Sequence, residues 1–239
     1  MDQKIYSPNN AAKQWILDQI KDNSGERAIT IVDFGCGYGS VWPTFLSDHP
    51  QYQYKGFDFN RSEIEKAKQA FANLPNAQVA LADAQKQLVL PESADVITAF
   101  SALEHIVDLK AFVTAVLTAL RPGGRAYLNY DAGHFRSHDL KERLMVPISQ
   151  WLAKVGIEGP YMKEVDDDRL CEIVQQLGGK VITVRKHNCQ ALKGFLKKHS
   201  DNQAAINIWF GFEEAISGAM SPKDLHKLFL STTVVIEKV

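Results

Sequence analysis

The sequence predicts a doubly wound, three-layer α/β fold, in which helices cover both faces of a mostly parallel sheet. Short apolar segments rich in β-branched residues alternate along the chain with segments whose apolar residues recur at helical spacing. The first short segment, residues 29–34, is apolar on both faces, as expected of a strand buried between two helical layers. Both observations point to parallel strands joined by helices.

Seven short apolar runs bounded by turn residues are predicted to form strands. They are residues 29–34, 54–59, 78–82, 94–100, 124–130, 180–186 and 232–238. A helix is predicted before the first strand, because Ala12, Trp15, Ile16 and Ile20 share one helical face.

Capping and stop signals mark the helices between the strands. Asn60 is predicted to cap a helix that Pro75 ends. Asp108 is predicted to cap a second helix, which ends before Pro122. The carboxylates of residues 166–168 place negative charge at the start of a third.

Two stretches are too long to be ordinary connections. Residues 131–165 and 190–229 carry helical patterns of their own, and we expect them to form a lid over the C-terminal edge of the sheet. The whole chain, residues 1–239, is then a single domain. Its core is expected to comprise about residues 28–130, 166–189 and 230–239.

A glycine-rich turn follows the first strand, and it is the most informative part of the sequence. Asp33, Gly35, Gly37 and Gly39 lie in the segment VDFGCGYGS. Glycines allow a tight turn and let a ligand approach the backbone. Asp58 ends the second strand, where a carboxylate can accept both hydroxyls of a ribose. The alternative is a turn that needs glycines only for packing.

Five motifs in order resemble the class I S-adenosylmethionine (SAM)-dependent methyltransferases, over about residues 28–130. They are VDFGCGYG, GFDFN, ALADA, ADVITAFSALEHI and LRPGGRAYL. A dinucleotide dehydrogenase more often has Gly or Ala where Ser40 stands. The resemblance implies SAM as the cofactor. It also implies that residues 232–238 form a seventh, antiparallel strand at the sheet edge.

The resemblance further implies the parts of the cofactor site. Asp33 and the three glycines would border the methionine moiety, and Asp58 would bind the ribose. Asp83 in ALADA would accept a hydrogen bond from the adenine amino group. The bland alternative for each aspartate is a helix cap or a strand-end turn.

The remaining implied contacts lie on either side of the cofactor. Phe59 would contact the adenine with its ring face, and Ala84 with its backbone amide. Phe100 and Ser101, which end the fourth strand, would line the methyl-transfer site.

Methyl transfer from a sulfonium is an in-line displacement, so a base is needed only when the nucleophile carries a proton to be removed. His105 and His134 are the candidate catalytic residues, because they follow strands four and five and imidazole titrates near neutral pH. Other candidates at the same edge are Tyr130, Asp131 and His138. His105 has the alternative role of shaping its loop. No metal is expected, because no third ligand joins His134 and His138.

The net charge and the hydropathy pattern of the chain limit the kinds of partner that are expected. A net charge of −1 gives no field for a polyanion, so nucleic acid is not expected as a partner. No run of 18 apolar residues or leader pattern occurs, so we expect a cytoplasmic protein without a membrane partner. The basic run Arg185, Lys186 and His187 is expected on a solvated surface strand, and the later Lys193, Lys197 and Lys198 on a solvated helix. The alternative is that these residues attract an acidic substrate or carrier.

A small-molecule acceptor with an oxygen or nitrogen nucleophile is favoured. The end of strand four lacks the Asn/Asp-Pro-Pro-aromatic sequence of base-amine methyltransferases, and Glu104 is alone where arginine methyltransferases use two glutamates. Aromatic residues of the two long stretches would line the pocket or pack as plain core: Trp151, Tyr161, Trp209, Phe210 and Phe212. The alternatives are a non-catalytic SAM-binding subunit and a methyltransferase of proteins.

Overall fold

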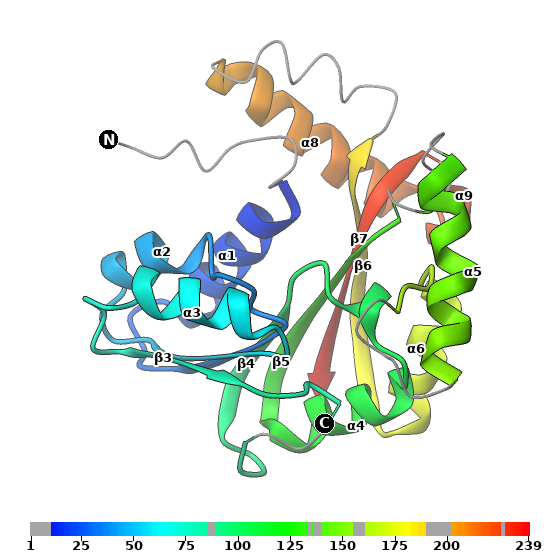
Figure 1. Ribbon diagram of the computed structural model, residues 1–239. Helices are drawn as coiled ribbons and strands as arrows, with labels where there is room; N and C mark the ends of the chain where they lie inside the picture. Colours follow the sequence, from blue (N-terminus) through cyan, green and yellow to red (C-terminus); the bar gives the residue numbers. More distant parts are fainter. Residues whose placement is uncertain are drawn as a thin grey trace.

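Seven strands form one mixed sheet in the order β3-β2-β1-β4-β5-β7-β6 in the computed structural model (Figure 1). The structure describes residues 11–85, 89–132, 135, 140–154, 161–189, 202–225 and 228–239. Strand β7 runs antiparallel to both of its neighbours, whereas the pairs among the first five strands are parallel. The predicted fold class and the antiparallel last strand are therefore confirmed.

All seven predicted strands are present. They are β1 (Thr30–Phe34), β2 (Gln53–Asp58), β3 (Ala77–Leu81), β4 (Ala94–Ala99), β5 (Leu120–Asp131), β6 (Gly179–Cys189) and β7 (Phe229–Lys238). The last three are longer than predicted. Strand β5 begins earlier, at Leu120, which pairs with Ala94 of β4, and the antiparallel ladder between β6 and β7 continues as far as Cys189 paired with Phe229. Apolar runs predict only the apolar part of a strand, so they do not include the polar residues at the end of that ladder.

Helices begin where the sequence places caps. The helices are α1 (Ala11–Ser24), α2 (Trp42–Asp48), α3 (Arg61–Ala70), α4 (Leu109–Ala119), α5 (Leu140–Lys154), α6 (Asp167–Gln176), α8 (Gln203–Ala219) and α9 (Pro222–Leu225), with a 3-10 turn, η2 (Leu103–His105). The side chains of Asn60, Asp108 and Asp166 accept hydrogen bonds from the first turns of α3, α4 and α6. Helix α2 was not predicted, since only Trp42 and Leu46 of its seven residues are buried.

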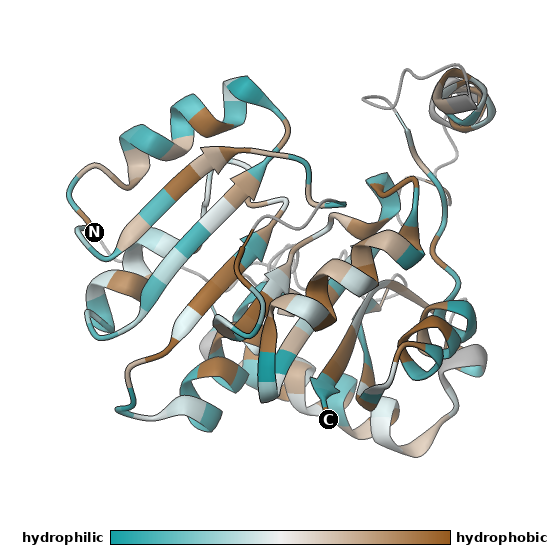
Figure 2. Cartoon of the chain, turned by 90° about the horizontal axis from the view of Figure 1, so that it is seen from below, coloured by the Kyte–Doolittle hydropathy of each residue, from teal (hydrophilic) through white to brown (hydrophobic). Residues whose placement is uncertain are grey.

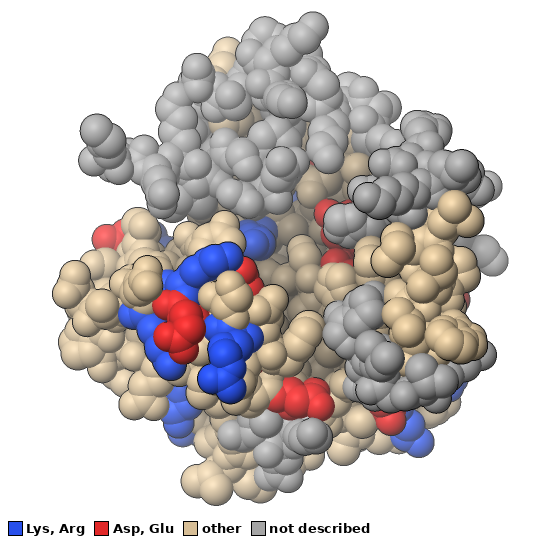
Figure 3. Space-filling view, in the orientation of Figure 1, with Lys and Arg blue, Asp and Glu red and all other residues tan. Residues whose placement is uncertain are grey.

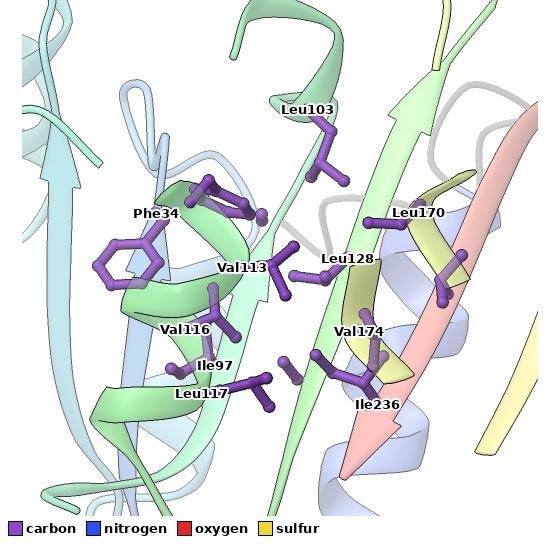
Figure 4. Packing of buried hydrophobic residues seen from close by; sticks show 14 of the residues in the cluster. Phe34, Ile97, Leu103, Val113, Val116, Leu117, Leu128, Leu170, Val174 and Ile236 are labelled. Carbon is purple, nitrogen blue, oxygen red and sulfur yellow. The ribbon is translucent and has the colours of Figure 1, made fainter. Parts of the chain in front are cut away.

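Two hydrophobic layers enclose the sheet. Alternate residues of β1 supply both, because Val32 packs with α4 and α6 while Ile31 packs with α1 and α2. Figure 4 shows the first layer, in which Val113 and Val116 of α4 face the sheet. Figure 2 shows hydrophobic residues concentrated on the strands and on the helix sides that face them. This is the expected three-layer arrangement.

The outer surface of α3 carries both signs of charge. Lys66 and Lys68 lie 2.6 and 2.9 Å from Glu63 and Glu65, at i,i+3 spacing. Figure 3 shows these charges intermixed on the molecule's face. Such exposed pairs contribute little to stability, and among the described residues the surface of α3 presents no single sign of charge to a partner.

The basic run on β6 is buried, so its predicted place on a solvated surface is wrong. Lys186 is 1% exposed and pairs with Asp167 of α6. The Arg185 guanidinium carbon lies 5.1 Å from the centre of the Trp15 ring. His187 is 1% exposed and lies within hydrogen-bond distance of Thr233. Charge pairing and the cover of α1, α6 and α8 make this burial possible.

Helix α8 covers the end of β6 (Figure 1). Its Trp209 is buried in a cluster with Cys189, Leu225 and Phe229, so this aromatic residue packs as core. In α5, by contrast, Trp151 is 62% exposed. The joint lid remains a prediction, and residues 133–134, 136–139, 155–160, 190–201 and 226–227 of the two stretches lie outside the described part.

Within the described ranges, no helix combines the length and the apolar content that a bilayer crossing requires. Cys36 and Cys189 are buried thiols and Cys171 is partly buried. Burial raises the pKa of Cys171 to about 11, which makes it a poor nucleophile at neutral pH.

Candidate functional site

The glycine turn after β1 adopts a backbone that other residues rarely tolerate. Gly35, Gly37 and Gly39 have φ values of +77°, +54° and +72°. A Cβ on Gly39 would stand 2.4 Å from the Phe71 ring, and one on Gly35 would stand 2.8 Å from the Ala102 Cβ. Packing and backbone conformation therefore require glycine at these two positions, and the role of the turn in ligand access stays a prediction.

Asp58, at the end of β2, connects the glycine turn to the start of α3. Its Oδ2 accepts a hydrogen bond from the Gly37 amide at 2.8 Å, and its Oδ1 accepts one from the Asn60 amide at 2.8 Å. The residue is 9% exposed and lines a cavity. Each carboxylate oxygen keeps a second lone pair, so the same group can hold the turn and still accept from a ligand.

A cavity of about 230 Å³ opens at the C-terminal edge of the parallel strands. Loops that follow β1, β2, β3 and β4 line it, as expected of ligand sites in open α/β sheets. Of the predicted residues, the cavity brings together Gly35, Asp58, Phe59, Asp83, Ala84, Ser101 and His105. Phe59 is 59% exposed, so its ring is open to a flat ligand.

Gln85 also lines this cavity, and the sequence analysis missed it. Its backbone amide donates to Asp83 Oδ1 at 3.0 Å, while its own Oε1 accepts from the Asp108 amide at 2.7 Å. Gln85 thereby joins the loop after β3 to the start of α4. Its position next to ALADA was the available signal.

A second, smaller hollow adjoins the other side of the glycine turn. Gly35 lines both hollows, while Gly37, Gly39 and Phe100 line only the second. Lys13 of α1 also lines it, with its Nζ 5.7 Å from the centre of the Phe100 ring. Burial lowers the pKa of Lys13, and the charge of Asp33 partly opposes this effect. Nothing in a helical apolar stripe marks such a lysine, so sequence reasoning missed it.

Asp33 lines neither of these hollows and is fully buried behind them. Its oxygens accept from Trp42 Nε1 at 2.7 Å, from Thr98 Oγ1 at 2.8 Å and from the Tyr54 hydroxyl at 3.0 Å. Burial raises the pKa of Asp33 to about 6, although these hydrogen bonds oppose the shift. Asp33 supports the wall of the second hollow through Trp42, and its contact with a methionine moiety remains a prediction.

His105, in η2, lines the larger cavity, and its ring is held by a hydrogen bond to the backbone of Tyr161. Its Nδ1 lies 3.0 Å from the backbone oxygen of Tyr161. Because a carbonyl oxygen only accepts, Nδ1 carries the hydrogen, and the neutral ring keeps its lone pair on Nε2. This tautomer suits a base.

Helix α5 anchors the segment that holds His105. Ser149 Oγ accepts from the Met162 amide, and Gln150 Nε2 donates to the Met162 carbonyl, both at 3.2 Å. One of the two long stretches is therefore tied to the candidate base. His134 and His138 lie outside the described residues, so the other histidine candidates remain predictions.

Tyr130 is unsuited to act as a base. Its hydroxyl donates to Asp167, and burial raises the pKa of Tyr130 well above its usual range. Asp131 lies beside Glu104, whose Oε1 accepts from the Asp131 amide at 3.3 Å. Burial raises the pKa of Glu104 to about 8.

Comparison with known proteins identifies the family of the chain. The methyltransferase domain family matches residues 9–184. The chain is 26% identical over 153 residues to a trans-aconitate 2-methyltransferase of Variovorax paradoxus, covering 64% of this chain and 54% of that protein. It is also 26% identical over 181 residues to a ubiquinone biosynthesis O-methyltransferase of Aeromonas salmonicida, covering 73% and 71%. The chain thus spans about half the length of the first of these relatives.

The fold is shared with solved structures. A SAM-dependent methyltransferase from Mesorhizobium loti superposes with a TM-score of 0.65 at 16% identity, covering 97% of this chain and 100% of that one. This likeness shows the fold, while the family match covers more than half of the sequence, including the glycine turn, Asp58 and Asp83. The chain therefore belongs to the methyltransferase domain family.

Proposed function

We propose that the protein transfers the methyl group of SAM to an oxygen or nitrogen nucleophile of a small molecule. One observation carries the proposal. A cavity lined by the Asp58 carboxylate and by His105, whose Nδ1 is held by the Tyr161 oxygen, meets a second hollow at Gly35, at the sheet edge where open α/β sheets bind ligands.

The residues present fit the cofactor along its length. Asp58 would accept from the ribose hydroxyls, and Asp83 from the adenine amino group. The exposed ring of Phe59 and the backbone of Ala84 would cover the adenine. Lys13 offers a positive charge to the carboxylate of the amino-acid end, beyond the glycine turn.

When bound, SAM supplies a methyl group on a sulfonium, which is reactive without a metal or a covalent enzyme intermediate. The chain has to align the acceptor and remove its proton. His105 Nε2 is the proposed acceptor of that proton, since Tyr161 fixes the ring and its tautomer. Ser101 and Phe100 lie between the two hollows and would border the transferring methyl group.

Two further points favour a small acceptor. The relatives reported above are named for trans-aconitate and for ubiquinone biosynthesis. In this chain, α5 holds the His105 loop through Met162, so we propose that residues 131–165 and 190–229 build the acceptor pocket and exclude water from it.

The test is incubation with SAM labelled in its methyl group and a pool of metabolites, with the Asp58→Ala protein as the matched control. Labelled small products that form with wild type and not with the control support the proposal. Label on protein instead indicates a protein substrate. SAM binding without any transfer indicates a non-catalytic subunit, and tighter binding of NADH than of SAM contradicts the cofactor assignment.

A further inference from the structure

Ser101 has a strained backbone at the centre of the site. Its φ is +48°, in the left-handed region that residues with a Cβ seldom occupy. It follows β4 and Phe100 directly and is exposed to the larger cavity. Such a conformation persists only when surrounding groups hold it.

The group that holds Ser101 is the side chain of Asn129 on β5. The Ser101 amide donates to Asn129 Oδ1 at 3.2 Å. The β4–β5 ladder pairs its last residues at Ala99 and Leu128. The Asn129 side chain thus supplies the acceptor for Ser101 just beyond the point where the two strands part.

The opposite end of the Asn129 amide is fixed to β7. Nδ2 lies 3.0 Å from Ser231 Oγ, 3.0 Å from the Thr232 oxygen and 3.1 Å from Thr233 Oγ1. The Thr232 carbonyl can only accept, so Nδ2 has to face β7 and Oδ1 has to face Ser101. Asn129 is 1% exposed, so water does not replace these partners.

The turn that Asn129 holds forms the wall between the two hollows. Phe100 lines the smaller one, while Ser101 and Ala102 line the larger. Ala102 also packs so close to Gly35 that a Cβ added at Gly35 would stand 2.8 Å from the Ala102 Cβ. A shift of this turn would therefore change the space on both sides of the glycine turn.

We propose that Asn129 is a positioning residue for the cofactor. It connects β7 to the Ser101 amide and holds the left-handed turn in the shape that leaves room for SAM beside Gly35. The inference rests on the proposed function, because it assigns the two hollows to the two ends of SAM. Asn129 itself lines neither hollow and acts through Ser101.

The test is a double-mutant cycle between Asn129→Ala and Ser101→Gly, with SAM affinity measured by calorimetry. Asn129→Ala is expected to weaken SAM binding about tenfold when residue 101 is serine, because the turn loses its support. In the Ser101→Gly background the same substitution should weaken binding less than about threefold, since glycine adopts positive φ without help.

Asn76→Ala is the matched control. Asn76 is a buried asparagine directly before β3, it does not line the cavity, and its Nδ2 donates to the Tyr52 oxygen at 2.9 Å. It should lower the melting temperature as Asn129→Ala does, with SAM affinity unchanged. Unchanged affinity in Asn129→Ala, or an equal loss in both backgrounds, would overturn the positioning role. Failure of the wild-type protein to bind SAM would instead refute the cofactor assignment.

Discussion

Replacement of Asp58 by alanine should weaken SAM binding strongly. Each Asp58 carboxylate oxygen accepts a hydrogen bond at 2.8 Å, one from the Gly37 amide and one from the Asn60 amide, and Asp58 is 9% exposed. The substitution removes the acceptor of the proposed ribose hydroxyls. It also releases the Gly37 amide, which shapes the glycine turn.

The size of the effect follows from the type of hydrogen bond that is lost. A hydrogen bond to a charged group contributes about 1.5 to 3 kcal/mol net. Since about 1.4 kcal/mol corresponds to tenfold in affinity, the dissociation constant for SAM should rise by about tenfold to about 150-fold. A further increase is expected if the loosened turn raises the cost of ordering the site.

Calorimetric titration with SAM and with its demethylated product measures this change, well below the melting temperature of each variant. Asp95→Ala is the matched control, because Asp95 also accepts a backbone amide, from Thr30 at 2.7 Å, and pairs with Arg121 at 2.8 Å, yet lines neither hollow. An Asp58→Ala protein that binds SAM as tightly as wild type would show that the ribose is held elsewhere.

Three further predictions test separate parts of the site. Lys13→Met should weaken SAM binding by about three- to tenfold through loss of the charge at the amino-acid end, and equal affinity in calorimetry would remove Lys13 from the site. His105→Ala should lower kcat at least about 100-fold more than it changes SAM affinity, and equal losses in both would leave His105 only a loop-shaping role. Gly39→Ala should lower the melting temperature more than Gly25→Ala. Both glycines have positive φ, but a Cβ added at Gly39 would stand 2.4 Å from the Phe71 ring and one added at Gly25 would meet nothing within 4 Å; equal losses would contradict the packing argument.

The main parts of the fold were predictable because local signals agree with the tertiary structure. Residues 29–34 are apolar on both faces, and their strand is covered on both faces. The side chains of Asn60 and Asp108 accept hydrogen bonds from the first-turn amides of their helices, as predicted from their capping positions. Such signals depend only on residues a few positions away along the chain, so they can be recognised in the sequence itself.

The remaining features depend on distant partners. Lys186 reads as a surface residue until Asp167, 19 residues earlier, is seen to pair with it. Asn129 reads as one polar residue in a strand, and its importance depends on Ser101 and on β7. Lys13 lies on an ordinary amphipathic helix and reaches the site only because α1 packs beside the glycine turn. Periodicity and motif spacing contain no information about these contacts.

The burial of Glu104 predicts how stability changes with pH. Glu104 is 1% exposed, and burial raises its pKa from 4.5 to about 8. Between these two values the folded protein keeps a proton that the unfolded chain has released. The folded state therefore loses stability as pH rises through this range, by about 1.4 kcal/mol per pH unit for one such group, and loses no more from this group above about pH 8.

Glu104→Gln should remove this dependence, because an amide of the same shape carries no titrating proton and its oxygen can still accept from Asp131. The free energy of unfolding of the variant relative to wild type should therefore rise from pH 5 to pH 8 and then level off. Urea unfolding of both proteins at half-unit steps from pH 5 to pH 9.5 measures the difference. If the two stability curves run parallel throughout, Glu104 is not held protonated by the fold, and the carboxyl beside Asp131 is ionised at the edge where the methyl acceptor is proposed to bind.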